Sequence, residues 1–172
     1  MRIPHGVVVV TLLSLANAQT NPKADLVRQK VDEISTALIS GDFAKVVDLT
    51  YPKVVQMVGG REKMIDLLKA GTQETLAHGS AITAVVVGTP LEFRTVGKDV
   101  FVVVPSSITL SVPGGKLTQK SFTVGVSSDA GRTWFFVDAN NLAGEKIKMV
   151  FPTFPATLQL PPRPPPIFER MR

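Results

Sequence analysis

The sequence predicts an α+β fold in which helices pack on one face of a curved antiparallel sheet. Up to Ala77, apolar residues recur at helical spacing. From Ser80 onward the chain is rich in valine, threonine and phenylalanine, with a period close to two. Because helices come first and the links between strands are short, we expect an antiparallel sheet of about five to six strands rather than a parallel one.

Residues 1–18 have the features of a cleavable signal peptide. Arg2 gives a weakly basic start, Val7–Val10 and two leucines form a short apolar core, and residues 16–18 offer a small-x-small cleavage site. The apolar run is shorter than the roughly 20 residues of a membrane-spanning helix. A buried N-terminal strand made of the same valines is the alternative. We therefore predict an exported protein, periplasmic or secreted, without a membrane span.

Helical periodicity predicts three N-terminal helices. The first follows Pro22, which suits a first helical turn, and ends at Gly41. The second begins after Asp42 as its N-cap, and the third covers residues 61–77. Pro52 is expected to interrupt the second helix or to bend it into a further short piece.

Strands are expected after residue 80. Their ranges are about 81–88, 91–96, 99–104, 106–113, 117–127 and 133–138. Pro105 is interpreted as a break between two of them. Residues 145–150 suit either a short helix or an extended segment.

The C-terminal end is rich in proline from Pro152 onward and is expected to be polyproline II. It either lies as a strap over the domain surface or binds a partner. The predicted organisation is a signal peptide at 1–18, an α+β domain at 19–151 and a C-terminal strap at 152–172.

Composition excludes several classes of site. The 172 residues contain no cysteine, so disulfides, a thiolate nucleophile and cysteine metal ligands are all absent. The net charge is +5, but the basic residues are scattered and there is one Trp and one Tyr, which argues against nucleic-acid binding. With a single histidine after the leader and no ligand-like spacing of carboxylates, we predict neither a metal nor a cofactor.

The step Gly41-Asp42-Phe43, with helices followed by a bent sheet, resembles the NTF2-like (cystatin-like cone) superfamily. The stretch 51–62 and the later pattern from Ser127 to Asp138 also resemble small uncharacterised secreted bacterial proteins. The likeness covers residues 25–160. It implies a cone between helices and sheet that holds ligands, in a superfamily of isomerases, dehydratases, hydrolases, transport adaptors and noncatalytic modules. Its isomerases and dehydratases rely on buried Asp, His or Tyr residues.

The segment from Ser127 to Trp134 fits the Asp-box pattern S-x-D-x-G-x-T-W. In this pattern Asp accepts backbone hydrogen bonds across a turn, Gly takes a positive φ and Trp packs beneath the hairpin. Propellers repeat the motif in successive blades, whereas this chain has one copy. We therefore predict a hairpin turn rather than a glycan site.

Six residues are candidates for lining a ligand site: Tyr51, His78, Glu92, Arg94, Trp134 and Asp138. Tyr51 lies at a helix break, where its hydroxyl would donate to a bound carbonyl, or else its ring belongs to the core. His78 follows the third helix as a base or a metal ligand, or as a C-terminal residue that interacts with helix carbonyls.

The remaining candidates lie on the predicted strands. Glu92 and Arg94 share one strand face and would form a charged pair beside a ligand if that face looks inward. The other face of the same strand is more apolar. Asp138 follows a strand end and either caps the next loop or lies at the mouth of the cone with Trp134.

The predicted function is an exported, noncatalytic domain that binds a small apolar ligand or a partner protein, including a second copy through its open sheet face. The alternative is an enzyme of isomerase, dehydratase or hydrolase type that uses His78 or a buried carboxylate with Tyr51. The lack of an evident catalytic constellation favours the first.

Overall fold

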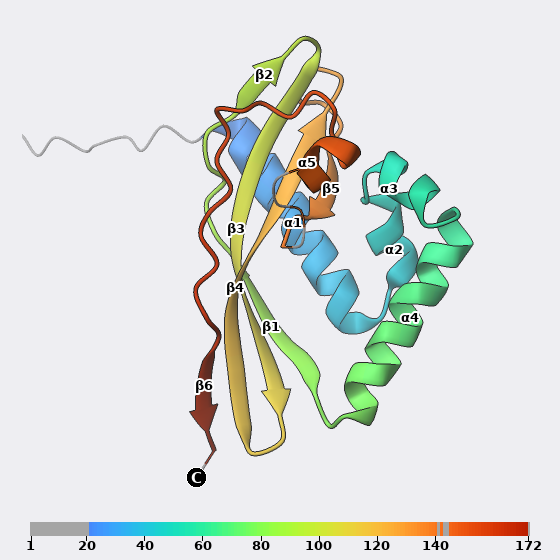
Figure 1. Ribbon diagram of the computed structural model, residues 1–172, viewed down its shortest axis with the longest axis vertical. Coiled ribbons are helices and arrows are strands. Elements are labelled where there is room, and N and C mark those ends of the chain that lie inside the picture. Colours follow the sequence, from blue (N-terminus) through green and yellow to red (C-terminus); the bar gives the residue numbers. More distant parts are fainter. Residues whose placement is uncertain (1–20, 141, 143–144, 172) are drawn as a thin grey trace, which may run out of the picture.

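The computed structural model describes residues 21–140, 142 and 145–171. The predicted signal peptide lies outside these residues. In chain order the elements are α1 (Pro22–Ser40), α2 (Phe43–Asp48), α3 (Pro52–Met57), α4 (Arg61–Ala77), β1 (Ala81–Val87), β2 (Arg94–Val96), β3 (Asp99–Val112), β4 (Gly115–Ser127), β5 (Phe135–Asp138), α5 (Glu145–Val150) and β6 (Ile167–Arg170). The predicted α+β class is confirmed: helices α1 to α4 lie along one side of a twisted antiparallel sheet (Figure 1).

The first two helices begin and end where the local sequence predicts. The Asn21 side chain accepts hydrogen bonds from the first turn of α1, and Gly41 ends that helix with a left-handed φ of 77°. Asp42 then caps α2 by accepting from the Lys45 backbone N–H at 3.1 Å. These caps fix the sharp reversal that places α2 beside α1.

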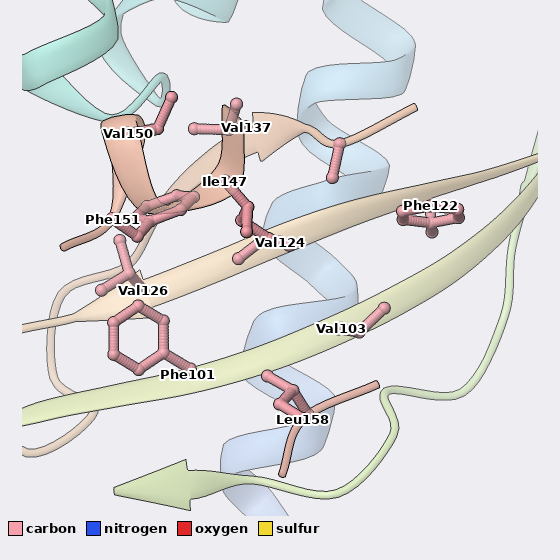
Figure 2. Packing of buried hydrophobic residues seen from close by; sticks show 11 residues of the cluster. Phe101, Val103, Phe122, Val124, Val126, Val137, Ile147, Val150, Phe151 and Leu158 are labelled. Atoms are coloured by element: carbon pink, nitrogen blue, oxygen red, sulfur yellow. The ribbon is translucent and has the colours of Figure 1, made fainter. Parts of the chain in front are cut away.

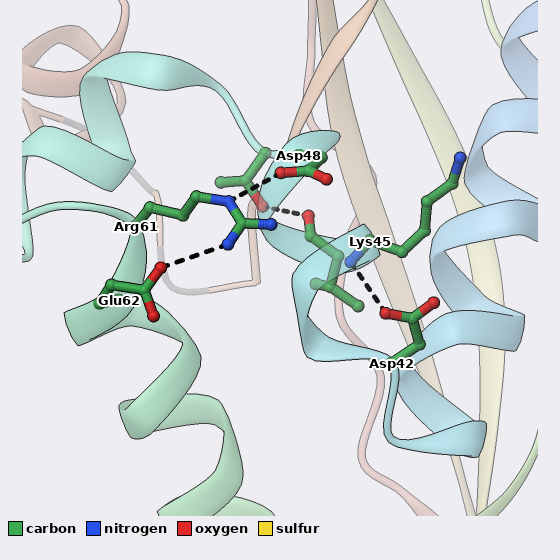
Figure 3. A network of polar contacts seen from close by, with 7 residues as sticks. Asp42, Lys45, Asp48, Arg61 and Glu62 are labelled. Atoms are coloured by element: carbon green, nitrogen blue, oxygen red, sulfur yellow. Dashed lines mark hydrogen bonds and ion pairs between the residues drawn. The ribbon is translucent and has the colours of Figure 1, made fainter.

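An exposed ion-pair network joins α2 to α4. The Arg61 Nε atom donates to Asp48 at 3.0 Å, while its Nη1 atom reaches Glu62 at 3.3 Å (Figure 3). Exposed pairs of this kind add little stability. Their consequence is positional, because they hold the start of α4 against the end of α2.

The helix count differs from the prediction, with four N-terminal helices rather than three. Of the two alternatives for Pro52, the structure shows the interruption, because this residue begins a separate helix, α3. Between α2 and α3, Thr50 forms a parallel bridge with Phe136 of β5. The Tyr51 N–H donates to the Phe136 carbonyl at 2.9 Å, and the Phe136 N–H donates to the Leu49 carbonyl at 2.9 Å. Backbone pairing with the sheet therefore separates α2 from α3.

The sheet has the order β1-β3-β4-β5, with β2 also paired to β3 and β6 paired to β4. All of these pairings are antiparallel. β3 and β4 form a long hairpin whose register runs from Val100 opposite Ser127 to Val112 opposite Gly115. Two predicted strands are shorter than expected, since β2 begins only at Arg94 and β5 only at Phe135.

The expected break at Pro105 is wrong, because β3 runs through it without interruption. The Pro105 carbonyl accepts from the Gly88 N–H at 2.8 Å. The nitrogen and carbonyl of one strand residue point to the same side, so the Pro105 nitrogen also faces Gly88, one residue past the end of β1 at Val87. The hydrogen bond that proline cannot make therefore lies at the end of β1 and not within its paired residues.

Alternating residues give the sheet two buried faces. One, here called the helix face, carries Val100, Val102 and Val104, which pack with Val27 and Val31 of α1. Gly125 belongs to this face, and a Cβ there would lie 3.0 Å from Phe136 and 3.1 Å from Val102. Side chains of β3 and β5 thus crowd this position and would have to shift to admit a methyl group.

The other face, here called the C-terminal face, is covered by α5 and the segment that follows it. Phe101 on β3 packs edge-on against Phe151, with ring centroids 5.8 Å apart. Figure 2 shows this aromatic pair among the valines of β3, β4 and β5. Phe154 is part of the same packing and Leu158 is buried. The sheet face expected to be open is therefore covered by the chain itself over this half of the sheet.

The C-terminal segment ends in a strand that the sequence did not predict. β6 pairs with β4 at the edge of the sheet, with Leu117 opposite Phe168. Gly115 allows this close approach, since a Cβ there would lie 2.2 Å from the Glu169 carbonyl oxygen. All four side chains of β6 are exposed, so backbone pairing is its main contact with the body.

Candidate functional site

A pocket of about 320 Å³ lies between the four N-terminal helices and the helix face of the sheet. Helices α1 to α4 and strands β1, β3, β4 and β5 contribute to its wall. The lining residues are Val31, Ile34, Ser35, Leu38, Val46, Thr50, Val54, Met64, Leu68, Val85, Ser106, Ile108, Ser121, Thr123, Phe136, Val137 and Asp138. Its place corresponds to the cone that the resemblance implied.

The wall of this pocket is largely apolar. Valine, isoleucine, leucine, methionine and phenylalanine side chains form most of it, and Asp138 is the only ionisable lining residue. Two of the lining hydroxyls already donate to helix carbonyls: Ser35 within α1 to Val31, and Thr50, just past the end of α2, to Val46, each at 2.8 Å. Because both hydroxyls already donate to nearby backbone carbonyls, the helix side of the pocket is only weakly polar.

The polar groups gather where β4 meets β5. Asp138 lies opposite Thr123 in the strand register, which places the two side chains on the same face. The Asp138 carboxylate accepts from the Asn140 N–H at 2.8 Å, and the Asn140 side-chain amide donates to Ser121 at 2.6 Å. One end of an otherwise apolar pocket thus offers a carboxylate and two hydroxyl-bearing side chains.

Asp138 is the one predicted site residue that lines the pocket, and it also accepts the loop hydrogen bond that the capping alternative described. His78 lies elsewhere, exposed at the end of α4. Its Nδ1 atom is 2.8 Å from the Glu74 carbonyl oxygen, an interaction with the helix C-terminus.

Glu92 and Arg94 are brought together as an ion pair, but neither lines the pocket. The Glu92 side chain is 63% exposed and that of Arg94 is 38% exposed. Phe93 between them packs edge-on against Trp134, with ring centroids 5.8 Å apart. The inner face of this segment is therefore the apolar one.

Tyr51 and Trp134 belong to the packing of the molecule. Tyr51 is half-buried with its ring 4.9 Å from that of Phe151, on the C-terminal face. Burial raises the pKa of its hydroxyl, and the negative charge of Asp99 raises it further. Trp134 is buried beneath the hairpin, where its indole N–H donates to the Gly131 carbonyl at 3.0 Å.

The Asp-box segment forms the hairpin turn that the sequence predicted. Asp129 accepts from the backbone N–H groups of Arg132 at 3.0 Å and Thr133 at 2.8 Å, and from the Ser127 hydroxyl at 2.8 Å. These hydrogen bonds lower the pKa of Asp129 to about 2. Gly131 has a φ of 94°, as the motif requires.

Sequence reasoning missed the serine and threonine positions that line the pocket on the sheet side. Ser106, Ser121 and Thr123 occupy inward positions of β3 and β4, where the preceding residues of β3 are buried valines. A change from valine to hydroxyl residues at alternate inward positions is the signal that would have located them.

Neither a protein-family model nor a curated protein matches this chain. A solved structure from Novosphingobium aromaticivorans, described as an NTF2-like protein with a cystatin-like fold, is similar to it. The two are 17% identical, the match covers 71% of this chain and 87% of that chain, and the TM-score is 0.45. This likeness says nothing about an activity of this chain.

Among the residues that the structure describes, none of the helices is both long and apolar enough to cross a membrane. Within the same residues, no group of three or more His, Asp or Glu side chains is arranged to hold a metal ion.

Proposed function

We propose that this protein is an exported, noncatalytic domain that binds a small, largely apolar molecule in the pocket between its helices and its sheet. The observation that carries the proposal is the pocket itself. Its volume of about 320 Å³ and its apolar wall with a few gathered polar groups are typical of small-molecule sites.

The polar end of the pocket supports a ligand with one hydrogen-bonding group. An apolar body would contact residues such as Ile34, Leu68 and Ile108, while a hydroxyl or amine would meet Asp138 and Thr123. Because apolar burial supplies most of the affinity and a polar pair fixes orientation, one such group is enough for selectivity.

The arrangement of titratable groups supports binding over catalysis. The enzyme alternative needed His78 or a carboxylate to act with Tyr51 inside the cone. Tyr51 and His78 are not part of the pocket lining, and Asp138 stands there without a second ionisable group. General acid–base chemistry requires the participating groups within hydrogen-bond reach of the substrate.

Export is proposed from the predicted signal peptide. Its test is the intact mass of the protein recovered from the periplasm or medium of expressing cells. Cleavage after Ala18 would leave Gln19 as the first residue, whereas a mass that includes residues 1–18 would contradict export by this route.

Binding is tested by calorimetric titration with 2-naphthol, a neutral aromatic with one hydroxyl. Val85 lines the pocket, whereas its neighbour Val86 is 66% exposed. Val85→Phe fills the pocket and is expected to weaken 2-naphthol binding at least tenfold, while the control Val86→Phe leaves it unchanged. No binding to the unmodified protein, or equal loss in both variants, would contradict the proposal.

A further inference from the structure

A second hollow, of about 540 Å³, lies at the end of the molecule where α1 begins. Three segments that are distant in sequence form it: the first turn of α1, the β2–β3 turn and the tip of the β4–β5 hairpin. Figure 1 shows α1 starting near the β2 end of the sheet. The lining residues are Lys23, Thr95, Gly97, Lys98, Val100, Ser128, Asp129, Ala130 and Arg132, none of which lines the apolar pocket.

The hollow carries an excess of positive charge. Lys23, Lys98 and Arg132 line it, against one carboxylate, that of Asp129. Within the part of the chain that the structure describes, none of these three cations forms an ion pair. The Asp129 carboxylate already accepts hydrogen bonds from its own turn and is therefore a poor partner for them.

Lys23 is held in place rather than extended into solvent. Its side chain lies against Gly131, where a Cβ would be 2.8 Å from the Lys23 Cε atom and 3.2 Å from its Nζ atom. The ammonium group is 6.0 Å from the centre of the Phe93 ring. Because Gly131 has no side chain, it leaves room for Lys23 beside the Asp-box turn. A lysine that is already ordered loses less conformational entropy when it binds a ligand.

We propose that this hollow binds a phosphate group, either free or as the ester of a small soluble molecule. Two lysines and one arginine from separate segments match a compact oxyanion, since Arg presents paired donors and Lys acts as a point charge. The hollow is larger than one phosphate ion, so it has room for the rest of an ester. Neutral apolar ligands are disfavoured because the lining is charged.

The test is an NMR titration of the ¹⁵N-labelled protein at constant ionic strength. Sodium phosphate replaces sodium chloride in one arm and glycerol 3-phosphate replaces it in the other. Saturable shifts are expected at the amides of residues 97–98 and 128–132. Tighter binding of the ester would indicate a phosphate ester as the ligand, and equal binding would indicate free phosphate. Linear, unsaturable shifts in both arms would overturn the proposal.

Variants that remove one positive charge test whether phosphate binds in this hollow. Lys98→Gln and Lys23→Gln are each expected to weaken phosphate binding about tenfold, as loss of one charge-assisted hydrogen bond predicts. Lys23→Arg should retain most of the affinity, and Lys69→Gln on the exposed surface of α4 should retain all of it. Equal affinity in Lys98→Gln and Lys69→Gln would contradict a site in this hollow. Because the apolar pocket proposed for 2-naphthol shares no lining residue with this hollow, the affinity for 2-naphthol should not change in these variants.

Discussion

Asp129 shows how a single residue fixes a local structure. Its carboxylate closes the turn by accepting hydrogen bonds from two backbone N–H groups and one hydroxyl. The closed turn then places Trp134 beneath the hairpin. The residue types of the motif were sufficient to predict this geometry from sequence, because every interaction in it is local.

Asp129 makes the stability of the protein change with pH in the acid range. The native pKa of about 2 lies below the ordinary value of 3.8, so the unfolded chain takes up the proton first as the pH falls. The stabilisation by Asp129 is therefore complete above pH 3.8 and is lost as the pH falls toward 2. Asp129→Asn should show a shallower fall of the melting temperature across this range. A slope equal to that of the unmodified protein would contradict the assignment.

Two glycines with opposite surroundings test the packing of the helix face. A Cβ at Gly125 would press on Phe136 and Val102, whereas one at Gly71 within α4 has nothing within 4 Å. Gly125→Ala should destabilise the protein by about 1–3 kcal/mol through overpacking. Gly71→Ala should stabilise it by about 0.5–1 kcal/mol through helix propensity. Chemical denaturation measures both, and the same sign of change in the two variants would contradict this packing.

At the scale of elements, the C-terminal segment acts as a cover for one sheet face. Phe151 is 1% exposed and packs against the rings of Tyr51, Phe101 and Phe154. The irregular stretch between α5 and β6 thus contributes to the core through Phe151, Phe154 and Leu158.

Removing one of these rings tests that contribution. Phe151→Ala should destabilise the protein by about 3–5 kcal/mol, as for other buried phenylalanines. Met149→Ala, at a residue 64% exposed in the same segment, should have little effect. Denaturant melts of both variants measure this, and a small loss for Phe151→Ala would mean that the segment is not part of the core.

Helical and strand periodicity predicted most elements because they report which side chains are buried. The errors occur where backbone pairing between distant segments decides. Pro105 was expected to end a strand, but its nitrogen faces Gly88, just past the end of β1. Pro52 was expected either to interrupt the second helix or to bend it into a further piece, and pairing of residues 50–51 with β5 makes it an interruption. β6 forms because part of β4 has an unpaired edge and because Gly115 lets the chain approach closely. Neither condition can be recognised from the local sequence of β6.

The candidate site was predicted less well than the fold. Of the six proposed residues, Asp138 lines the pocket, while the hydroxyl residues on its sheet side, Ser106, Ser121 and Thr123, were not singled out. Short polar side chains on strands carry no strong sequence signal, because the same residues are common on exposed faces. Only the positions of the helices that cover them show that these residues line a pocket.

At the scale of the whole molecule, the sheet separates two interiors. The C-terminal face is filled by aromatic and aliphatic side chains, whereas the helix face is filled near α1 and hollow between α1, α4 and the middle of the sheet. A filled layer on one side supports a cavity on the other, because the strands that line the pocket are held rigidly from behind.

The proposed ligand site is the apolar pocket, and its most direct test is a methyl NMR titration of the full chain with 2-naphthol. Saturable shifts are expected at methyl groups of Val31, Ile34 and Ile108 in the pocket, with those of Val103 and Leu158 on the C-terminal face unchanged. Shifts confined to the C-terminal face, or no saturable shift at any methyl group, would contradict binding in this pocket.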